Sequence, residues 1–305
     1  MTLAERLQQL SPHVRHCPTG CHSVDRFLSG GIRGGDITQV TGSEGCGKSQ
    51  FCYSIAADQI LKGNRVLYID MDSSFSAERV TAILRNKAGP TARLKSHMDL
   101  MHVVQVCKLA ELFDLLHKLI DDMRNTESMI HKYSIMILDS VPVFLTPHMT
   151  QLDLLGEEEA QFSVFKGLIR ALNVLRHANP SLAFLVTNNK LEWFKTMWKN
   201  ACSVTLLLKE KKPVILSPKA ASVSPSPCTG LSEEAAAGGG DVAVSPSRVD
   251  VVHQLEIIRS NALTVHSDPC LDVVITDSGF RDHSPTVTGD DTSATRGVKE
   301  ERKVQ

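Results

Sequence analysis

An eight-residue glycine-rich segment constrains this chain more than any other feature of its sequence. The segment runs from Gly42 to Ser49 and fits the pattern G-x-x-x-x-G-K-[ST]. In this pattern backbone N–H groups surround a phosphate, the lysine meets the β- and γ-phosphates, and the last hydroxyl binds Mg²⁺. An apolar run, Ile37–Thr41, precedes the segment and a helical pattern follows it, which places a helix N-terminus at the anion. The alternative is a glycine-rich turn with an exposed lysine.

We therefore expect a site for ATP and Mg²⁺. The residues expected to bind the nucleotide are Gly42, Ser43, Glu44, Gly45, Cys46, Gly47, Lys48, Ser49 and Gln50. Ser49 is also the first expected ligand of the metal ion.

The apolar pattern around this segment predicts an α/β fold with a mainly parallel central sheet flanked by helices. Short apolar runs alternate with longer amphipathic runs, as in strands that are joined by crossover helices. The expected strands are Asp36–Thr41, Arg65–Asp70, Met101–Val106, Ser134–Asp139 and Leu182–Thr187. The expected helices are Lys48–Leu61, Ser76–Asn86, Leu109–Arg124 and Glu157–His177.

The C-terminal third departs from this alternation. Three apolar runs, Ser203–Lys209, Val251–Arg259 and Leu271–Thr276, predict late antiparallel strands that close one edge of the sheet. Residues 211–249 are rich in Pro, Ser, Ala and Gly, so we expect a disordered loop inserted in a hairpin. We expect residues 1–18 to form a short lead-in, residues 19–280 the folded domain, and residues 281–305 a disordered tail.

Charge and composition narrow the classes of partner. The chain has 33 Lys and Arg residues against 34 Asp and Glu residues, so no global positive field predicts non-specific nucleic-acid binding. No apolar stretch approaches the roughly 18 residues that cross a bilayer, and the N-terminus lacks the apolar region of a signal peptide. The eight cysteines are scattered and one lies inside the glycine-rich segment, which suits a reducing compartment. We expect a soluble intracellular protein with no membrane partner.

Cys17 and Cys21 form a small cluster with nearby histidines. A zinc site needs a second pair of ligands at a defined spacing, and none follows soon in the sequence. We therefore favour a polar lead-in with incidental thiols over a metal site.

Two of the expected strands end in carboxylates. Asp139 closes a run of four apolar residues, where a carboxylate suits a magnesium ligand acting with Ser49. A purely structural aspartate is less favoured, because a buried carboxylate is costly away from solvent or a cation. Another strand ends in Asp70 and Asp72, either of which could orient an attacking water. Asp70 could instead cap or pair structurally.

These residues together resemble the RecA-type recombinases, and specifically the eukaryotic recombinase paralogues that assist strand exchange in homologous recombination. The resemblance covers about residues 19–280. The matching segments occur in the family's order: Thr19–Ile32, Gly35–Gly42, the glycine-rich segment, Lys48–Cys52, Tyr68–Arg79, Leu138–Ser140, Val186–Asn189 and Asn200–Ser203. The resemblance implies a RecA-like P-loop ATPase core.

The family also implies roles for particular residues, with some departures. Lys48, Asp72 and Asn189 would be the catalytic set, and Arg79 would stack on adenine unless it is simply a solvated helix arginine. The family usually has a glutamate at the position of Asp72, and a carboxylate set back by about 1 Å can cost on the order of 10²-fold in rate. Asn189 replaces the family's γ-phosphate-sensing glutamine. We therefore expect ATP binding with slow hydrolysis.

Two segments correspond to the family's DNA-binding loops. The first, Thr146–Glu159, is acidic and lacks arginine, which argues against a self-sufficient filament. The second, Lys190–Lys199, interleaves aromatic residues with lysines, a composition suited to binding single-stranded DNA. The candidate DNA contacts are Lys190, Trp193, Lys195, Trp198 and Lys199. The alternative, that the aromatic residues pack against the core or a partner, is slightly favoured.

The resemblance implies a nuclear, ATP-binding accessory factor of recombination repair. Its expected partners are other recombinase paralogues, the main strand-exchange recombinase and single-stranded DNA. Segment 1–18 carries no Phe-x-x-Ala peptide, and Ser267–Cys270 resembles the part that caps a neighbour's nucleotide. The alternatives are a self-sufficient DNA-dependent ATPase that exchanges strands and a non-hydrolysing scaffold that keeps the P-loop for folding. A small-molecule P-loop kinase is a less favoured alternative. Such kinases need an arginine-rich lid over the phosphate acceptor, and no comparable cluster of arginines appears after residue 120.

Overall fold

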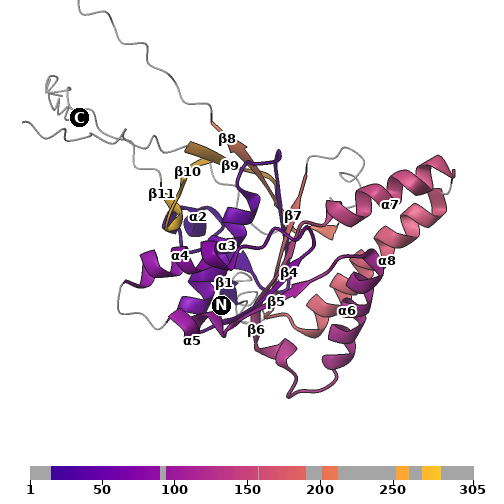
Figure 1. Ribbon diagram of the computed structural model, residues 1–305, viewed down its shortest axis with the longest axis horizontal. Helices are drawn as coiled ribbons and strands as arrows, with labels where there is room; N and C mark the ends of the chain where they lie inside the picture. The colour runs from indigo at the N-terminus through magenta and orange to yellow at the C-terminus, as the bar shows by residue number, and fades with distance from the viewer. Residues whose placement is uncertain are drawn as a thin grey trace, which may run out of the picture.

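The computed structural model describes residues 15–89, 94–156, 158–189, 201–211, 252–260 and 270–282 (Figure 1). Its strands are β1 His16–Cys17, β2 Ile32–Arg33, β3 Ile37–Thr41, β4 Arg65–Asp70, β5 Met101–Gln105, β6 Tyr133–Asp139, β7 Ala183–Asn188, β8 Val204–Glu210, β9 Val252–Ser260, β10 Cys270–Thr276 and β11 Gly279–Asp282. Its helices are α2 His22–Phe27, α3 Lys48–Leu61, α4 Ala77–Ala88, α5 Leu94–Met98, α6 Leu109–Asp122, η1 Met129–Lys132, α7 Pro142–Leu154 and α8 Glu158–Ala178.

A nine-stranded sheet forms the centre of the molecule, in the order β11-β10-β9-β8-β3-β7-β6-β4-β5. Strands β8, β3, β7, β6, β4 and β5 are parallel to one another. Because these strands run the same way, the carboxyl ends of β3, β4, β6 and β7 meet at one edge of the sheet, where α/β proteins place their ligands. This arrangement confirms the predicted α/β class and its mainly parallel sheet.

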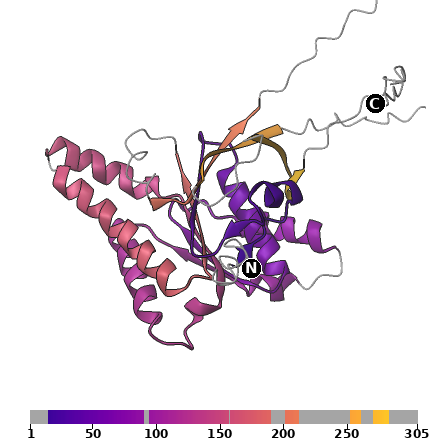
Figure 2. The ribbon, with the colours of Figure 1, turned by 180° about the vertical axis from the view of Figure 1, so that it is seen from behind.

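Helices cover both faces of the sheet and give it two apolar cores (Figures 1 and 2). Alternate residues of each strand point to opposite faces. On β6, Ile135 and Ile137 pack with α2, α3 and α4, whereas Met136 and Leu138 pack with α6 and α8. Every residue of β6 is buried, which explains why its sequence is a continuous apolar run.

The predicted elements match the structure to within two residues at each end. Helix α7 and the short elements β1, β2, α2, α5, η1 and β11 were not predicted. The late strands do form an edge, but β8 pairs parallel with β3, and antiparallel pairing begins only between β8 and β9. Residues 212–249 of the expected disordered loop, and 283–305 of the expected tail, lie outside the described residues.

Helix α7 corrects one prediction. The segment Thr146–Glu159, expected as a DNA-binding loop, is helical at residues 142–154 and from Glu158 onwards. Pro142 occupies the first helical position, where a proline has no N–H bond to lose. Leu145 is fully buried against the α6 and α8 side of the sheet, so apolar packing anchors the start of the helix.

The region near the N-terminus is also packed more closely than its sequence suggested. Cys17 and Cys21 are buried in the core with Val24 and Phe27. Burial raises the pKa of Cys21 to about 11, and its Sγ donates to Asp282 at 3.0 Å. These thiols are therefore part of the core. Among the described residues, no group of three or more His, Cys, Asp or Glu residues could hold a metal ion, and no helix could cross a membrane.

Candidate nucleotide-binding site

The loop between β3 and α3 has the shape that its glycines predict. Gly42 lies so close to the neighbouring strand that a Cβ there would be 2.4 Å from the carbonyl oxygen of Leu208. Gly45 has a φ of +76°, in the left-handed region that favours glycine. Gly47 caps α3, so the free N–H groups of the first helical turn face the loop. The loop and the helix end together form an anion site.

Lys48 is buried at the start of α3, and its ammonium group is held by the loop itself. Its Nζ donates to the carbonyl oxygen of Gly42 at 3.1 Å and to that of Ser43 at 2.8 Å. An ammonium group has three hydrogens, so these two bonds leave one for a phosphate oxygen. Gly42 and Ser43 thus position the lysine, and Cys46, which is buried, does not line the cleft.

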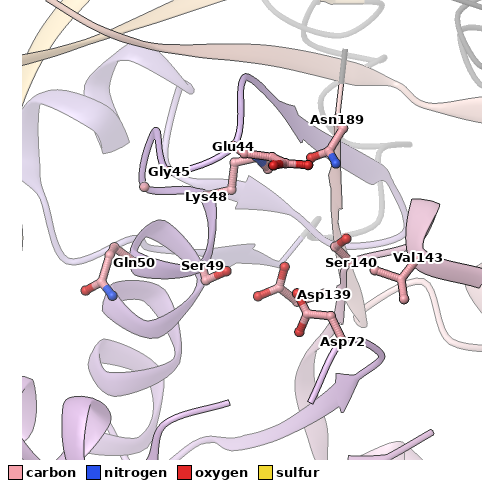
Figure 3. A pocket seen from close by; sticks show the side chains of 11 residues that line it. Glu44, Gly45, Lys48, Ser49, Gln50, Asp72, Asp139, Ser140, Val143 and Asn189 are labelled. Carbon is pink, nitrogen blue, oxygen red and sulfur yellow. The ribbon is translucent and has the colours of Figure 1, made fainter. Parts of the chain in front are cut away.

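A cleft of about 390 Å³ opens in front of this loop, within the size range of small-molecule sites. It is lined by Glu44, Gly45, Gly47, Lys48, Ser49, Gln50, Asp72, Asp139, Ser140, Val143 and Asn189. Most of the predicted site residues therefore meet in one cavity. In Figure 3, Asp139 and Asp72 lie across the cleft from Ser49, and Lys48 and Glu44 lie near Asn189.

Asp139 is buried at the end of β6, between two neutral donors. The hydroxyl of Tyr68 on β4 donates to its Oδ2, and the hydroxyl of Thr187 on β7 donates to its Oδ1. An ionised carboxylate accepts about four hydrogen bonds, so both oxygens keep acceptor capacity toward the cleft. Carboxylate, hydroxyl and water oxygens are the ligands that Mg²⁺ prefers. Asp139 and Ser49 therefore suit a magnesium ion.

The two carboxylates after β4 have different roles. Asp70 is buried and accepts from the backbone N–H groups of Ser74 and Phe75, and burial raises its pKa. It does not line the cleft, so it caps the turn, as one interpretation of the sequence allowed. Asp72 does line the cleft. Its Oδ1 accepts from the backbone N–H and the hydroxyl of Ser74, which sets the direction of the side chain.

The end of β7 supplies the polar residues opposite the loop. Thr187 and Asn188 are buried, and Asn189 follows the strand and lines the cleft. Asn189 shares the cavity with Lys48, and its role as a sensor of the γ-phosphate stays a prediction. Among the described residues, Oδ1 of Asn188 has no hydrogen-bond partner.

Arg79 is half-buried and does not line the cleft. Its Nε donates to Oε1 of Gln50 at 2.7 Å, and its Nη2 donates to the carbonyl oxygen of Thr276 at 2.6 Å. Asp277 lies 3.6 Å from its Nη1. Arg79 therefore joins the start of α3 to the turn between β10 and β11, beside a residue of the cleft.

Comparison with known proteins now adds to this geometry. The sequence model of the Rad51 family matches residues 12–214. The chain belongs to the Rad51 family. Among its relatives are the bovine "DNA repair protein RAD51 homolog 4", 26% identical over 61% of this chain, and the human "DNA repair protein RAD51 homolog 2", 37% identical over 28%. The "DNA repair and recombination protein RadB" of Thermoplasma acidophilum is 36% identical over 25%.

The alignments cover only part of these Rad51-family relatives. The chain spans 56% of the bovine protein, 23% of the human protein and 33% of the archaeal protein. Membership of the Rad51 family accounts for the mainly parallel sheet with its late antiparallel strands and implies a nucleotide-binding core.

The candidate DNA contacts of this Rad51-family chain lie outside the described residues. Lys190, Trp193, Lys195, Trp198 and Lys199 all fall between Asn189 and Ala201. They remain predictions. Of the segment resembling a nucleotide cap in Rad51-type assemblies, Ser267–Cys270, only Cys270 is described, as the first residue of β10.

Sequence reasoning missed several residues of the site. Tyr68 and Thr187 precede the ends of β4 and β7, so their apolar surroundings give no sign that they hold Asp139. Leu208 and Ile275 belong to the late strands, yet the first lies against Gly42 and the second against Gly47. Only the sheet order brings these strands behind the loop. One signal could have identified Tyr68. It is a hydroxyl-bearing residue near the end of a buried strand whose neighbour in the sheet ends in a carboxylate.

Proposed function

We propose that this Rad51-family protein binds ATP with Mg²⁺ and acts as an accessory factor in recombination repair of DNA. In this proposal it works in a heteromeric complex with other recombinase paralogues, close to the main recombinase on single-stranded DNA in the nucleus. The observation that carries the proposal is the single cleft in which Lys48, Ser49 and Asp139 meet. Lys48 would bind the β- and γ-phosphates, and Ser49 and Asp139 would hold Mg²⁺.

The names of the relatives support the biological part of the proposal. The bovine and human proteins carry the words "DNA repair protein", and the archaeal protein carries "DNA repair and recombination protein". The bovine match covers 61% of this chain, and the Rad51 family model, which matches residues 12–214, spans Lys48, Ser49 and Asp139. A role as an accessory paralogue would also account for Asp72 and Asn189, which replace the glutamate and glutamine usual in the family.

Slow turnover is the chemical consequence that we infer. Asp72 is anchored by Ser74 through two hydrogen bonds, so its carboxylate cannot freely extend toward a nucleotide. A general base or water-orienting group acts only when it lies within hydrogen-bonding reach of the water. With the shorter aspartate, bound ATP would persist. Nucleotide would then control assembly more than it drives rapid catalysis.

The decisive experiment compares the complexes that form around three versions of the chain in cells. These are the wild type, Lys48→Ala and Lys62→Ala, a matched control because Lys62 follows the other end of α3 and pairs with Asp58. Each recovered complex is assayed for ATP binding, and for ATP turnover with and without single-stranded DNA. We expect paralogues to co-purify with the wild type and Lys62→Ala, with slow turnover, and ATP binding to be lost in Lys48→Ala.

Two other outcomes would replace the proposal. Rapid turnover stimulated by DNA, lost in Lys48→Ala, would identify a self-sufficient DNA-dependent ATPase that exchanges strands. Intact repair and partner binding in Lys48→Ala would identify a scaffold that keeps the P-loop for folding. Recovery of a lone monomer from the wild type would remove the heteromeric proposal altogether.

A further inference from the structure

Helices α7 and α8 run side by side and extend away from the sheet (Figures 1 and 2). The base of this pair is anchored in the core by Leu145 and Phe165, both buried. Beyond the core the pair turns at Gly156, whose φ is +73°. We call residues 151–156 and 158–162 the arm tip. Because the arm tip lies far from the sheet, its exposed side chains are not needed for the packing that stabilises the fold.

The arm tip exposes large apolar side chains. Leu154 is 84% exposed, Leu155 is 64% exposed and Phe162 is 45% exposed. Single exposed apolar residues are common on protein surfaces, but these three gather where α7 ends and α8 begins and form a concentrated patch. Leu154 and Leu155 contribute little to the core, since most of their surface remains in water, and Phe162 leaves nearly half of its surface exposed. Patches of this kind typically mark binding sites for other molecules.

The charges around the patch select the kind of partner. Exposed Asp153 and Glu159 border the apolar residues, and Glu157 and Glu158 lie between them in the sequence. From Tyr133 to Phe165 the sequence contains no lysine or arginine. Such a surface repels the phosphates of DNA and of anionic lipids, and it repels a second copy of itself. A partner surface that is apolar at its centre and carries Lys or Arg at its rim would complement the arm tip in both apolar contact and charge.

We propose that the arm tip is the docking site for a different protein, which presents apolar side chains flanked by lysine or arginine. This inference rests on the proposed heteromeric function and adds the surface and the chemistry of one partner. In this arrangement Leu154, Leu155 and Phe162 are the apolar anchors, and the carboxylates at the rim orient the partner. The segment where the family places a DNA-binding loop serves protein association in this chain.

Binding is tested on the full chain with defined probes. One probe is a fluorescent 18-residue helical peptide with leucines on one face and lysines on the other. A second replaces each lysine by glutamate, and a third is a dT oligonucleotide. The test variant is Leu154→Ser/Leu155→Ser, and the matched control is Val174→Ser, since Val174 is 41% exposed on α8 outside the arm tip. Circular dichroism and ATP binding verify that both variants are folded.

We expect the lysine peptide to bind the wild type and Val174→Ser, and to lose about tenfold or more in affinity for the double variant. The glutamate peptide should bind at least about tenfold more weakly than the lysine peptide. A photoreactive amino acid at position 155 should cross-link, in cells, to a different protein through an apolar segment that carries Lys or Arg. Leu154→Ser should abolish that product.

Three outcomes would overturn the proposal. Equal affinity of wild type and double variant for the lysine peptide would remove the arm tip as its site. Loss of self-association in the double variant, with cross-links only between copies of this chain, would make the patch a homotypic interface. Loss of dT binding in the double variant would make it a DNA contact. Because neither variant touches the P-loop, intact ATP binding and paralogue recovery would leave the proposed function standing.

Discussion

Tyr68 donates its hydroxyl hydrogen to Oδ2 of Asp139, across two neighbouring strands that end at the nucleotide cleft. Thr187 binds the other oxygen from the opposite side. A buried carboxylate is costly when it lacks partners, so these two neutral donors stabilise the charge without neutralising it. The two hydroxyls therefore fix the direction of the Asp139 side chain at the floor of the site.

We predict that Tyr68→Phe weakens magnesium-dependent nucleotide binding. The change removes one donor from Asp139 and leaves the ring in the core, so the carboxylate loses its fixed direction. Loss of a hydrogen bond to a charged group costs about 1.5–3 kcal/mol, part of which appears as lower stability. ATP affinity measured in Mg²⁺ should fall about tenfold, whereas affinity measured in EDTA should change little.

Tyr53→Phe is the matched control for this prediction. Tyr53 is also buried, but its hydroxyl donates to the carbonyl oxygen of Ser74 and accepts from the N–H of Ser76. It should lower stability by a similar amount without a magnesium-specific effect on ATP affinity. Equal losses in Mg²⁺ and in EDTA for Tyr68→Phe would show that Tyr68 supports the fold and not the metal ligand.

Asp72→Glu should increase ATP turnover in the assembled complex. The glutamate restores the methylene that places the carboxylate about 1 Å further into the cleft, and positioning of this kind is worth up to about 10²-fold in rate. Asp72→Asn has no charge to polarise water and should abolish the remaining turnover. Both are compared with wild type by phosphate release at saturating ATP. An unchanged rate in Asp72→Glu would assign the slow step to something other than the position of this carboxylate.

Much of this architecture was readable from the sequence because the relevant signals are local. The apolar run of β6 and the glycine pattern from Gly42 to Ser49 each correspond to one segment with one geometry. Asp139 and Asp72 could be placed in the cleft because the carboxyl ends of parallel strands share one edge.

The remainder depends on contacts between segments that are distant in the chain. Asp70 and Asp72 are two residues apart, and only the turn around Ser74 decides which of them faces the cleft. Arg79 meets Thr276 because β10 and β11 return to the start of α3, and no local pattern encodes that return. Helix α7 was missed because Thr146–Glu159 was interpreted as the family's first DNA-binding loop. Pro142 at the first helical position is compatible with a helix.

Gly42 and Gly45 should respond to alanine for different reasons. A Cβ at Gly42 would lie 2.4 Å from the backbone oxygen of Leu208, which cannot move without disturbing β8. Gly42→Ala should therefore cost about 1–3 kcal/mol of stability and abolish ATP binding. Gly45 has open space around it, so Gly45→Ala incurs only the strain of its positive φ, about 1–2 kcal/mol, and should retain most ATP affinity. Equal ATP affinity in the two variants would contradict this assignment.

His253 should make stability depend on pH. It is buried on β9, its ring hydrogen-bonds to the backbone of Cys46 in the P-loop, and its Nδ1 has no partner among the described residues. Burial lowers its pKa below the ordinary 6.5, although nearby Glu210 acts in the opposite direction. The unfolded chain therefore binds this proton more readily than the folded chain, and stability rises with pH within that window.

As the pH falls below 6.5, the stability that neutral His253 contributes should be lost progressively. The loss should level off below the pKa that His253 has in the folded chain. Urea unfolding of wild type and His253→Gln at a series of pH values isolates the effect, because the two proteins share every other titrating group. The wild-type curve should lose more stability on acidification than the curve of His253→Gln. Parallel curves would mean that the pKa of His253 is the same in the folded and unfolded chains.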